Sequence, residues 1–237
     1  MKIRLEGKQK TPDQFTKDAW NNAAPDFWEY EEGKRAKLPD LFESFYRSYR
    51  DRFKNVLDVG CGSGKFLIPM VQDGLKVTGL DPADKMLEYA KKNLEKAKLK
   101  GKAKLLEGKS SKLDFPNESF DFVFAKGAIH HDTWAGIQQS FREVARVLEP
   151  GGSFLFQARS TKDSALDNAE RIKDTGITAK ELTGWKAGMF QHYFTKEELE
   201  QLAIANGFKI SVGPEEIIRV KNDGKKNARW WVIYRKA

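Results

Sequence analysis

The sequence predicts an α/β fold with a doubly wound, mostly parallel sheet, built as one domain over residues 1–237. From Lys54 onward, short apolar runs alternate with amphipathic segments, which is typical of strands and helices taking turns around a parallel sheet. The first apolar run leads directly into a glycine-rich turn. With 40% of its 237 residues hydrophobic, the chain can bury one sizeable core.

Five strands are predicted where apolar residues cluster. Several are continuous apolar runs, as expected for strands covered by helices on both faces of a sheet. The predicted strands are Asn55–Gly60, Lys76–Asp81, Ala103–Glu107, Phe120–Lys126 and Ser153–Arg159.

Three helices are predicted by apolar stripes or by capping residues. The segment Pro82–Lys98 carries one stripe at helical spacing, and a second stripe runs from Ile137 to Leu148. Thr195, followed three residues later by Glu198, forms a capping box, and Asn206-Gly207 is a typical helix end.

The tail predicts a terminal hairpin. Glu215–Val220 and Ala228–Arg235 are strand-like runs, and the polar segment between them contains Asp223-Gly224, which favours a reversal. The segments 1–50 and 161–194 lack this regular alternation, so we expect them to form coverings over the end of the sheet.

Composition excludes several kinds of site. One cysteine cannot form an internal disulfide, and with only three histidines we expect no metal site. No run approaches the roughly 20 apolar residues of a membrane span, and the amino terminus lacks a signal sequence, so we expect a cytoplasmic protein without a membrane partner. The charge of +8 is dispersed along the chain, which favours a solvated basic surface over a nucleic-acid footprint.

The glycine-rich turn predicts a nucleotide-like ligand. Gly60, Gly62 and Gly64 permit positive φ angles and leave room for close approach, and we expect the turn to offer its amide groups to a ligand. Asp81 ends the second strand 81 − 60 = 21 positions later, the spacing that brings a carboxylate to a ribose edge. Its alternative role is to cap the helix predicted to begin at Pro82. The third glycine follows the second after one residue, whereas the dinucleotide fingerprint has two there, so NAD is disfavoured.

Four segments in this order resemble the motifs of class I S-adenosylmethionine-dependent methyltransferases. They read LDVGCGSGKF, VTGLDPADKML, LDFPNESFDFVFAKGAIHH and FREVARVLEPGGSFLFQ, and YFTKEELEQLAIANGFKI resembles the late helix and strand of the small-molecule branch. The resemblance implies a seven-stranded sheet with one antiparallel strand, which the terminal hairpin would supply. It also divides the chain into an N-terminal helical cap (1–50), a cofactor-binding core (51–160), a lid or substrate insertion (161–194) and a C-terminal helix and hairpin (195–237).

The resemblance also implies which residues hold S-adenosylmethionine and, after reaction, S-adenosylhomocysteine. The glycine turn would meet the methionine portion, Asp58 would steady the turn and the amino group, and Asp81 would hold the ribose. Many relatives have an aspartate at the position of Lys109, so the adenine edge would be addressed by a neighbouring serine instead. The full predicted set is Tyr30, Asp58, Gly60, Cys61, Gly62, Asp81, Pro82, Met86, Lys109, Ser110, Ser111, Leu113, Lys126 and His131.

A sulfonium methyl group is already electrophilic, so few catalytic residues are needed. His130 and His131 follow the fourth strand and could accept a proton, although they could equally support the loop. Arg159 could hold an acceptor carboxylate or phosphate, or form a surface ion pair. Tyr193 completes the catalytic candidates; with Trp185, Phe190 and His192 it lies in the insertion and could wall the acceptor.

Absent motifs narrow the acceptor. No Asn/Asp-Pro-Pro-aromatic segment follows the fourth strand, so this chain resembles none of the branches that methylate amino groups of bases or of glutamine. The lone cysteine lies in the glycine turn, which excludes a cytosine-C5 mechanism. We therefore expect a small-molecule acceptor with an O, N or activated C nucleophile. The alternatives are a tRNA or RNA methyltransferase, motivated by the charge, and a noncatalytic cofactor-binding module, motivated by Lys109.

Overall fold

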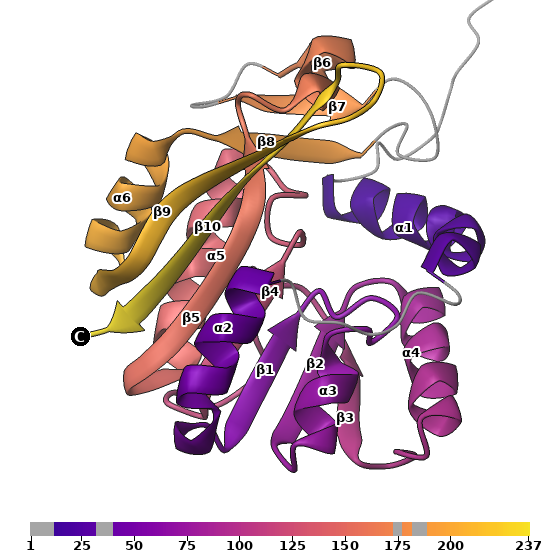
Figure 1. Cartoon of the computed structure of the whole chain (residues 1–237), viewed down its shortest axis with the longest axis vertical. Helices are drawn as coiled ribbons and strands as arrows, with labels where there is room; N and C mark the ends of the chain where they lie inside the picture. The colour runs from indigo at the N-terminus through magenta and orange to yellow at the C-terminus, as the bar shows by residue number, and fades with distance from the viewer. Residues whose placement is uncertain (1–11, 32–39, 173–176, 182–188) are drawn as a thin grey trace, which may run out of the picture.

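The five predicted strands are present in the computed structural model, which describes residues 12–31, 40–172, 177–181 and 189–237. They lie in the order β3-β2-β1-β4-β5, all in parallel, and their carboxyl ends point upward in Figure 1. The first strand ends one residue earlier than predicted because Gly60 adopts a φ of 72°. The strands are β1 (Asn55–Val59), β2 (Lys76–Asp81), β3 (Ala103–Glu107), β4 (Phe120–Lys126) and β5 (Leu148–Ser160).

The terminal hairpin completes seven strands. It consists of β9 (Phe208–Val220) and β10 (Lys226–Lys236), and β10 lies antiparallel between β5 and β9. The seven-stranded sheet with one antiparallel strand is therefore present in the order β3-β2-β1-β4-β5-β10-β9.

Three further strands extend the sheet to ten and were not predicted. They are β6 (Ala169–Arg171), β7 (Thr178–Glu181) and β8 (Phe190–Phe194), and they come after the short helix η2 (Ser164–Asn168). The last of them pairs in parallel with the end of β5, beyond the point where β4 ends. The insertion thus rises above the carboxyl end of the parallel strands, facing α1 (Figure 1).

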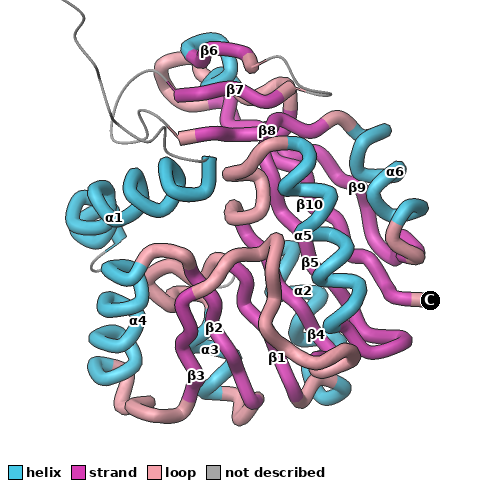
Figure 2. The backbone as a smooth tube through the Cα atoms, turned by 180° about the vertical axis from the view of Figure 1, so that it is seen from behind, coloured by secondary structure: helices cyan, strands magenta, loops and turns pink. Residues whose placement is uncertain are grey.

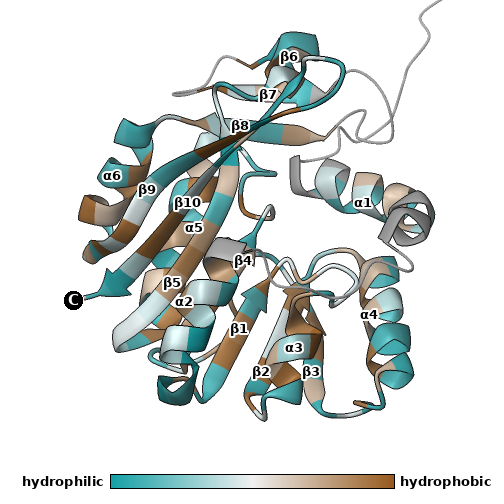
Figure 3. Cartoon of the chain, viewed as in Figure 1, coloured by the Kyte–Doolittle hydropathy of each residue, from teal (hydrophilic) through white to brown (hydrophobic). Residues whose placement is uncertain are grey.

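Helices cover both faces of the sheet. Apolar side chains of α2, α3 and α4 pack on one face, and those of α5 and α6 pack on the other. Figure 2 views the molecule from the opposite side to Figure 1, with α5 in front of the sheet. Figure 3 shows hydrophobic residues along the central strands and hydrophilic ones on the outside of α4. The helices are α1 (Pro12–Glu31), α2 (Asp40–Tyr49), η1 (Arg50–Arg52), α3 (Leu67–Gln72), α4 (Asp84–Lys96), α5 (Trp134–Val147) and α6 (Lys196–Ala205).

Local signals set the ends of these helices. The capping box of α6 is confirmed: the Thr195 hydroxyl accepts from the Glu198 amide at 3.2 Å, and the Glu198 carboxylate accepts from the Thr195 amide at 2.8 Å. The fourth helix begins at Asp84, not at Pro82 as predicted. The cause is a turn in which the Asp81 carboxylate accepts from the Ala83 amide at 2.9 Å. No helix in the described ranges is long and apolar enough to cross a membrane.

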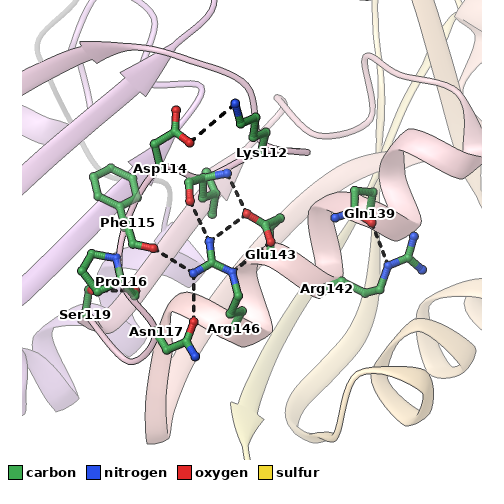
Figure 4. Close-up of polar contacts among 11 residues, drawn as sticks. Lys112, Asp114, Phe115, Pro116, Asn117, Ser119, Gln139, Arg142, Glu143 and Arg146 are labelled. Atoms are coloured by element: carbon green, nitrogen blue, oxygen red, sulfur yellow. Dashed lines mark hydrogen bonds and ion pairs between the residues drawn. The ribbon is translucent and has the colours of Figure 1, made fainter.

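One arginine fastens the loop between β3 and β4 to α5. Arg146 donates from Nη2 to the Leu113 carbonyl at 2.6 Å and from Nη1 to the Phe115 carbonyl at 2.8 Å (Figure 4). Glu143 binds the Arg146 side chain and accepts from the Leu113 amide at 2.8 Å. A single ion pair on α5 thereby satisfies the backbone of the loop that follows β3.

We expect Arg146→Ala to lower the free energy of unfolding by about 2 kcal/mol, because two loop carbonyls and Glu143 lose a charged donor. Urea unfolding measures this change. Arg142→Ala is the matched control on the same helix, since exposed Arg142 donates a hydrogen bond to the Gln139 side chain and not to a loop carbonyl, and it should cost under about 0.5 kcal/mol. Equal losses in the two variants would contradict the role given to Arg146.

Candidate active site

A cavity of about 380 Å³ lies at the carboxyl edge of the sheet. Its walls come from the segments that follow β1, β2, β3 and β4, from the end of β5, from β10 and from α1. Carboxyl ends of parallel strands meet at one edge, which is where ligands bind in open α/β sheets. Most of the predicted residues therefore converge here: Gly60, Cys61, Gly62, Asp81, Pro82, Met86, Lys109, Ser110, Ser111, Lys126, His130, His131 and Arg159.

The glycine turn borders the cavity and leaves room in it, because its glycines have no side chains. A Cβ on Gly60 would lie 2.2 Å from the Cβ of Ala128, so this position admits no side chain. A Cβ on Gly62 would meet nothing within 4 Å, and Gly62 lines the cavity. The amides of Gly60 and Cys61 donate to the Leu80 carbonyl, and the Gly62 amide donates to Asp81. The expectation that these amides remain available to a ligand is therefore wrong, since they hold the turn against β2.

Asp81 ties the turn to β2 and also lines the cavity. Its two carboxylate oxygens accept from the amides of Gly62 and Ala83, both at 2.9 Å. Burial raises the pKa of Asp81 to about 6, although the two amide hydrogen bonds act in the opposite direction. Each oxygen keeps a further acceptor site, so the carboxylate can still receive hydroxyl groups.

Asp58 lies behind the turn and does not line the cavity. It is 2% exposed, and its Oδ2 atom is buried without a hydrogen-bond partner among the described residues. Burial raises the pKa of Asp58 to about 8; the charge of Asp81 adds to this, and Lys126 opposes it. A buried carboxylate of this kind is costly unless a cation compensates it, and the amino group of an amino-acid ligand is such a cation.

The segment after β3 supplies an acceptor at the far side of the turn. Ser140 donates its hydroxyl proton to the Gly136 carbonyl at 2.9 Å, so Ser110 is the donor in the 2.9 Å contact between the two serine hydroxyls. Ser110 is thereby left with acceptor lone pairs, and it lines the cavity. Leu113 does not line it: this side chain is 2% exposed and packs in the core beneath α5.

His130 and His131 line the cavity after β4, with ring centroids 4.3 Å apart. The His131 Nδ1 lies 3.2 Å from the Phe190 carbonyl. A carbonyl can only accept, so Nδ1 carries the proton in the neutral ring and Nε2 carries the lone pair. The His130 carbonyl accepts from the His192 amide at 2.8 Å, which fixes the histidine loop to β8.

The helix α1 closes the cavity from the amino-terminal side. Trp20 lines it, and its ring meets the edge of His131 at a centroid distance of 5.3 Å. Thr16 donates to the His131 carbonyl at 3.3 Å, and Asn21 donates to Asp84 at 2.7 Å. The predicted contacts of Tyr30 and Trp185 fall outside the described residues, because neither side chain is described.

Two arginines lie at the opposite end of the cavity. Arg159 donates to the Asp163 carboxylate at 2.7 Å, and Arg229 forms an ion pair with the other oxygen of Asp163. Both arginines line the cavity. Tyr193 is fully buried and does not line it, and its ring lies 5.9 Å from the Arg159 guanidinium carbon.

Sequence reasoning missed several lining residues. Trp20 stands in the same aromatic segment as Tyr30, and this nearness in the sequence was the signal that could have identified it. Arg229 carried no signal, because its place depends on the register of β10 against β5. The missed lining residues with functional side chains are Thr16, Trp20, Ser63, Lys65, Asp132, Gln157 and Arg229.

The chain has the fold of solved S-adenosylmethionine-dependent methyltransferases. A methyltransferase of Methanosarcina mazei, described as S-adenosylmethionine-dependent, superimposes with a TM-score of 0.67 and 23% identity, over 84% of this chain and 98% of that one. The 1,6-didemethyltoxoflavin N1-methyltransferase of Burkholderia thailandensis, solved with 1,6-didemethyltoxoflavin and S-adenosylhomocysteine, superimposes with a TM-score of 0.69 and 15% identity, over 100% and 98%.

Sequence comparison finds methyltransferases over part of the chain. Residues 56–152 match the family model described as a methyltransferase domain. The uncharacterized methyltransferase YcgJ of Bacillus subtilis is 27% identical over 155 residues, which cover 62% of this chain and 59% of that protein, less than two thirds of its length. The match covers 97 of the 237 residues, and over this segment the resemblance of the motifs to methyltransferases is confirmed.

Proposed function

We propose that the protein transfers the methyl group of S-adenosylmethionine to a small-molecule acceptor and releases S-adenosylhomocysteine. One observation carries the proposal: a single cavity runs from the glycine turn and Asp81 to His130, His131 and Arg159. Cofactor-type and acceptor-type residues thus share one cavity, as an in-line displacement requires.

The residues at the turn fit the cofactor. Gly62 leaves the room that the methionine portion needs, and the buried Asp58 carboxylate behind the turn favours the positive charge of its amino group. Asp81 receives the ribose hydroxyls, and the Ser110 oxygen receives the adenine amino group. Ser110 thereby takes the place of the aspartate that many relatives have where this chain has Lys109.

The acceptor end needs only alignment and a proton acceptor. Bound S-adenosylmethionine supplies a sulfonium methyl group, which the acceptor nucleophile receives as the sulfur–carbon bond breaks and sulfur keeps the electron pair. His131 is the proposed base, because the Phe190 carbonyl leaves Nε2 with the lone pair. His130 lies beside it, and Trp20 on α1 limits access of water.

Two observations favour a small molecule over RNA. Thr16 and Trp20 of α1 line the cavity, and β7 and β8 of the insertion lie above the same edge of the sheet (Figure 1). Arg229, a basic residue of β10, lines this cavity with a side chain that is 18% exposed, so it does not contribute to an exposed basic patch. The Burkholderia neighbour was solved with a small molecule bound beside S-adenosylhomocysteine, which supports the same class of acceptor.

The test combines binding with turnover. Calorimetry with S-adenosylhomocysteine should give a dissociation constant in the micromolar range. Incubation with trideuteromethyl-S-adenosylmethionine and a metabolite extract should produce a labelled small molecule, detected by mass spectrometry. Label found only in added tRNA would support the RNA alternative. Binding without any labelled product would support a noncatalytic module.

Gly62→Ala should abolish this turnover while leaving the fold intact. The new methyl group meets no protein atom within 4 Å but occupies the ligand's side of the turn. The φ of 53° adds a strain of about 1 kcal/mol, which lowers stability only modestly. Gly224→Ala is the matched control, since Gly224 also has a positive φ and an unobstructed Cβ position but lies in the hairpin turn. Normal S-adenosylhomocysteine binding by Gly62→Ala would contradict the proposal.

A further inference from the structure

Arg159 and Arg229 are direct neighbours across two antiparallel strands. They occupy paired positions in the register of β5 and β10, where like charges destabilise a sheet. Asp163 lies between them and binds both guanidinium groups. Arg159 is 8% exposed, and the Arg229 side chain is 18% exposed, so little solvent screens the pair.

The three charges do not cancel. Two guanidinium groups and one carboxylate leave an excess positive charge at the cavity wall. Each guanidinium has five N–H donors, and Asp163 is the only hydrogen-bond partner of Arg159 within the described ranges. Burial and the neighbouring Arg159 guanidinium lower the pKa of Arg229, as expected where two like charges lie side by side. An anionic ligand group would supply the missing negative charge and accept hydrogen bonds from the remaining N–H donors.

The two arginines lie several strands away from the glycine turn, so the anion that they would bind is distinct from the cofactor. Side chains alternate along a strand, so Arg159 and Gln157 lie on the same face of the sheet as Leu155. In the same way, Arg229 lies on the face of Trp231 and Ile233. Leu155, Trp231 and Ile233 belong to one core cluster, so the two arginines are on one face of the sheet. Gly60 follows β1, whereas Arg229 is on β10, three strands away in the order β1-β4-β5-β10. At the usual strand spacing Arg229 is roughly 14 Å from β1, and Arg159, two strands away on β5, is roughly 10 Å from it. The carboxylate of a methionine portion held at the turn therefore does not account for the arginine pair.

We propose that the methyl acceptor carries an acidic group, a carboxylate or a phosphate, which Arg159 and Arg229 bind at the end of the cavity opposite the glycine turn. This inference rests on the proposed methyl transfer and specifies its acceptor class. Asp163 is a positioning residue, because it holds the two guanidinium groups side by side while leaving donors directed to other partners. Gln157, on the same strand face, lines the cavity between this pair and Lys126.

The labelled-methyl experiment with a metabolite extract tests the inference. The labelled product should contain a carboxylate or a phosphate, and its exact mass and fragmentation distinguish the two. A neutral or cationic product would overturn the acidic-acceptor inference while leaving methyl transfer intact. The absence of any labelled product would overturn the proposed function, and this inference with it.

Substitution then links the acid group to the arginines. Arg229→Gln and Arg159→Gln should each lower kcat/KM for the labelled acceptor by about 10- to 100-fold, mainly through KM. Affinity for S-adenosylhomocysteine should change less than about twofold, which also reports that the variants fold. Lys221→Gln is the matched control, because it removes one positive charge from an exposed hairpin position outside the cavity. Unchanged KM in both arginine variants would overturn the assignment.

Discussion

Asp81→Asn is expected to weaken S-adenosylhomocysteine binding by at least about 100-fold. Loss of hydrogen bonds from two ribose hydroxyls to a charged acceptor accounts for about 3 kcal/mol. The substitution also disturbs the turn, because the carboxylate accepts from both the Gly62 and the Ala83 amides. An asparagine side chain has only one acceptor oxygen, so its amide group must face one of these donors. Calorimetry measures the change in affinity.

Asp114→Asn is the control for Asp81→Asn. Its side chain is 84% exposed, it lies outside the cavity, and its ion pair with Lys112 is long at 3.9 Å. It removes the same charge and should leave binding unchanged. If Asp81→Asn bound S-adenosylhomocysteine as tightly as Asp114→Asn, the ribose assignment would be wrong.

Sequence patterns predicted those parts of the fold that depend on neighbours along the chain. The five parallel strands, the hairpin and the capping box of Thr195 and Glu198 all follow from local periodicity and local hydrogen bonds. The pairing of Asp81 with the glycine turn was also predictable, because adjacent parallel strands place both at one edge. The hydrogen bonds of the turn amides could not be predicted, because the Gly60 and Cys61 amides donate to the Leu80 carbonyl of another strand.

Long-range register set the limit of prediction. Arg229 meets Arg159 across 229 − 159 = 70 positions, and a shift of one residue in β10 would turn the Arg229 side chain to the other face. The strands β6 and β7 are only 3 and 4 residues long, too short for a periodic signal. Their pairing depends on β8, which in turn pairs with the end of β5 that extends beyond β4.

Asp58→Asn is expected to stabilise the protein without ligand at alkaline pH and to weaken cofactor binding. The pKa of an unfolded aspartate is about 3.9, and burial raises that of Asp58 to about 8 in the folded state. The folded state therefore binds more protons between these values, so its stability is greatest below about pH 4 and decreases as pH rises to about 8. Asparagine imitates the protonated carboxyl and removes this decrease.

The expected gain for Asp58→Asn is at least about 2 kcal/mol near pH 9 and almost nothing near pH 4, since each pKa unit corresponds to about 1.4 kcal/mol. Urea unfolding at several pH values measures the difference between the variant and the parent, in which other titrating groups largely cancel. The same substitution should weaken S-adenosylhomocysteine binding about 10-fold at alkaline pH, because it removes the negative charge behind the turn that favours the ligand's amino group. In the parent protein, affinity should rise as pH approaches about 8 and Asp58 ionises. Parallel stability curves for the two proteins would show that Asp58 is already charged at low pH and that the ligand is not needed to compensate it.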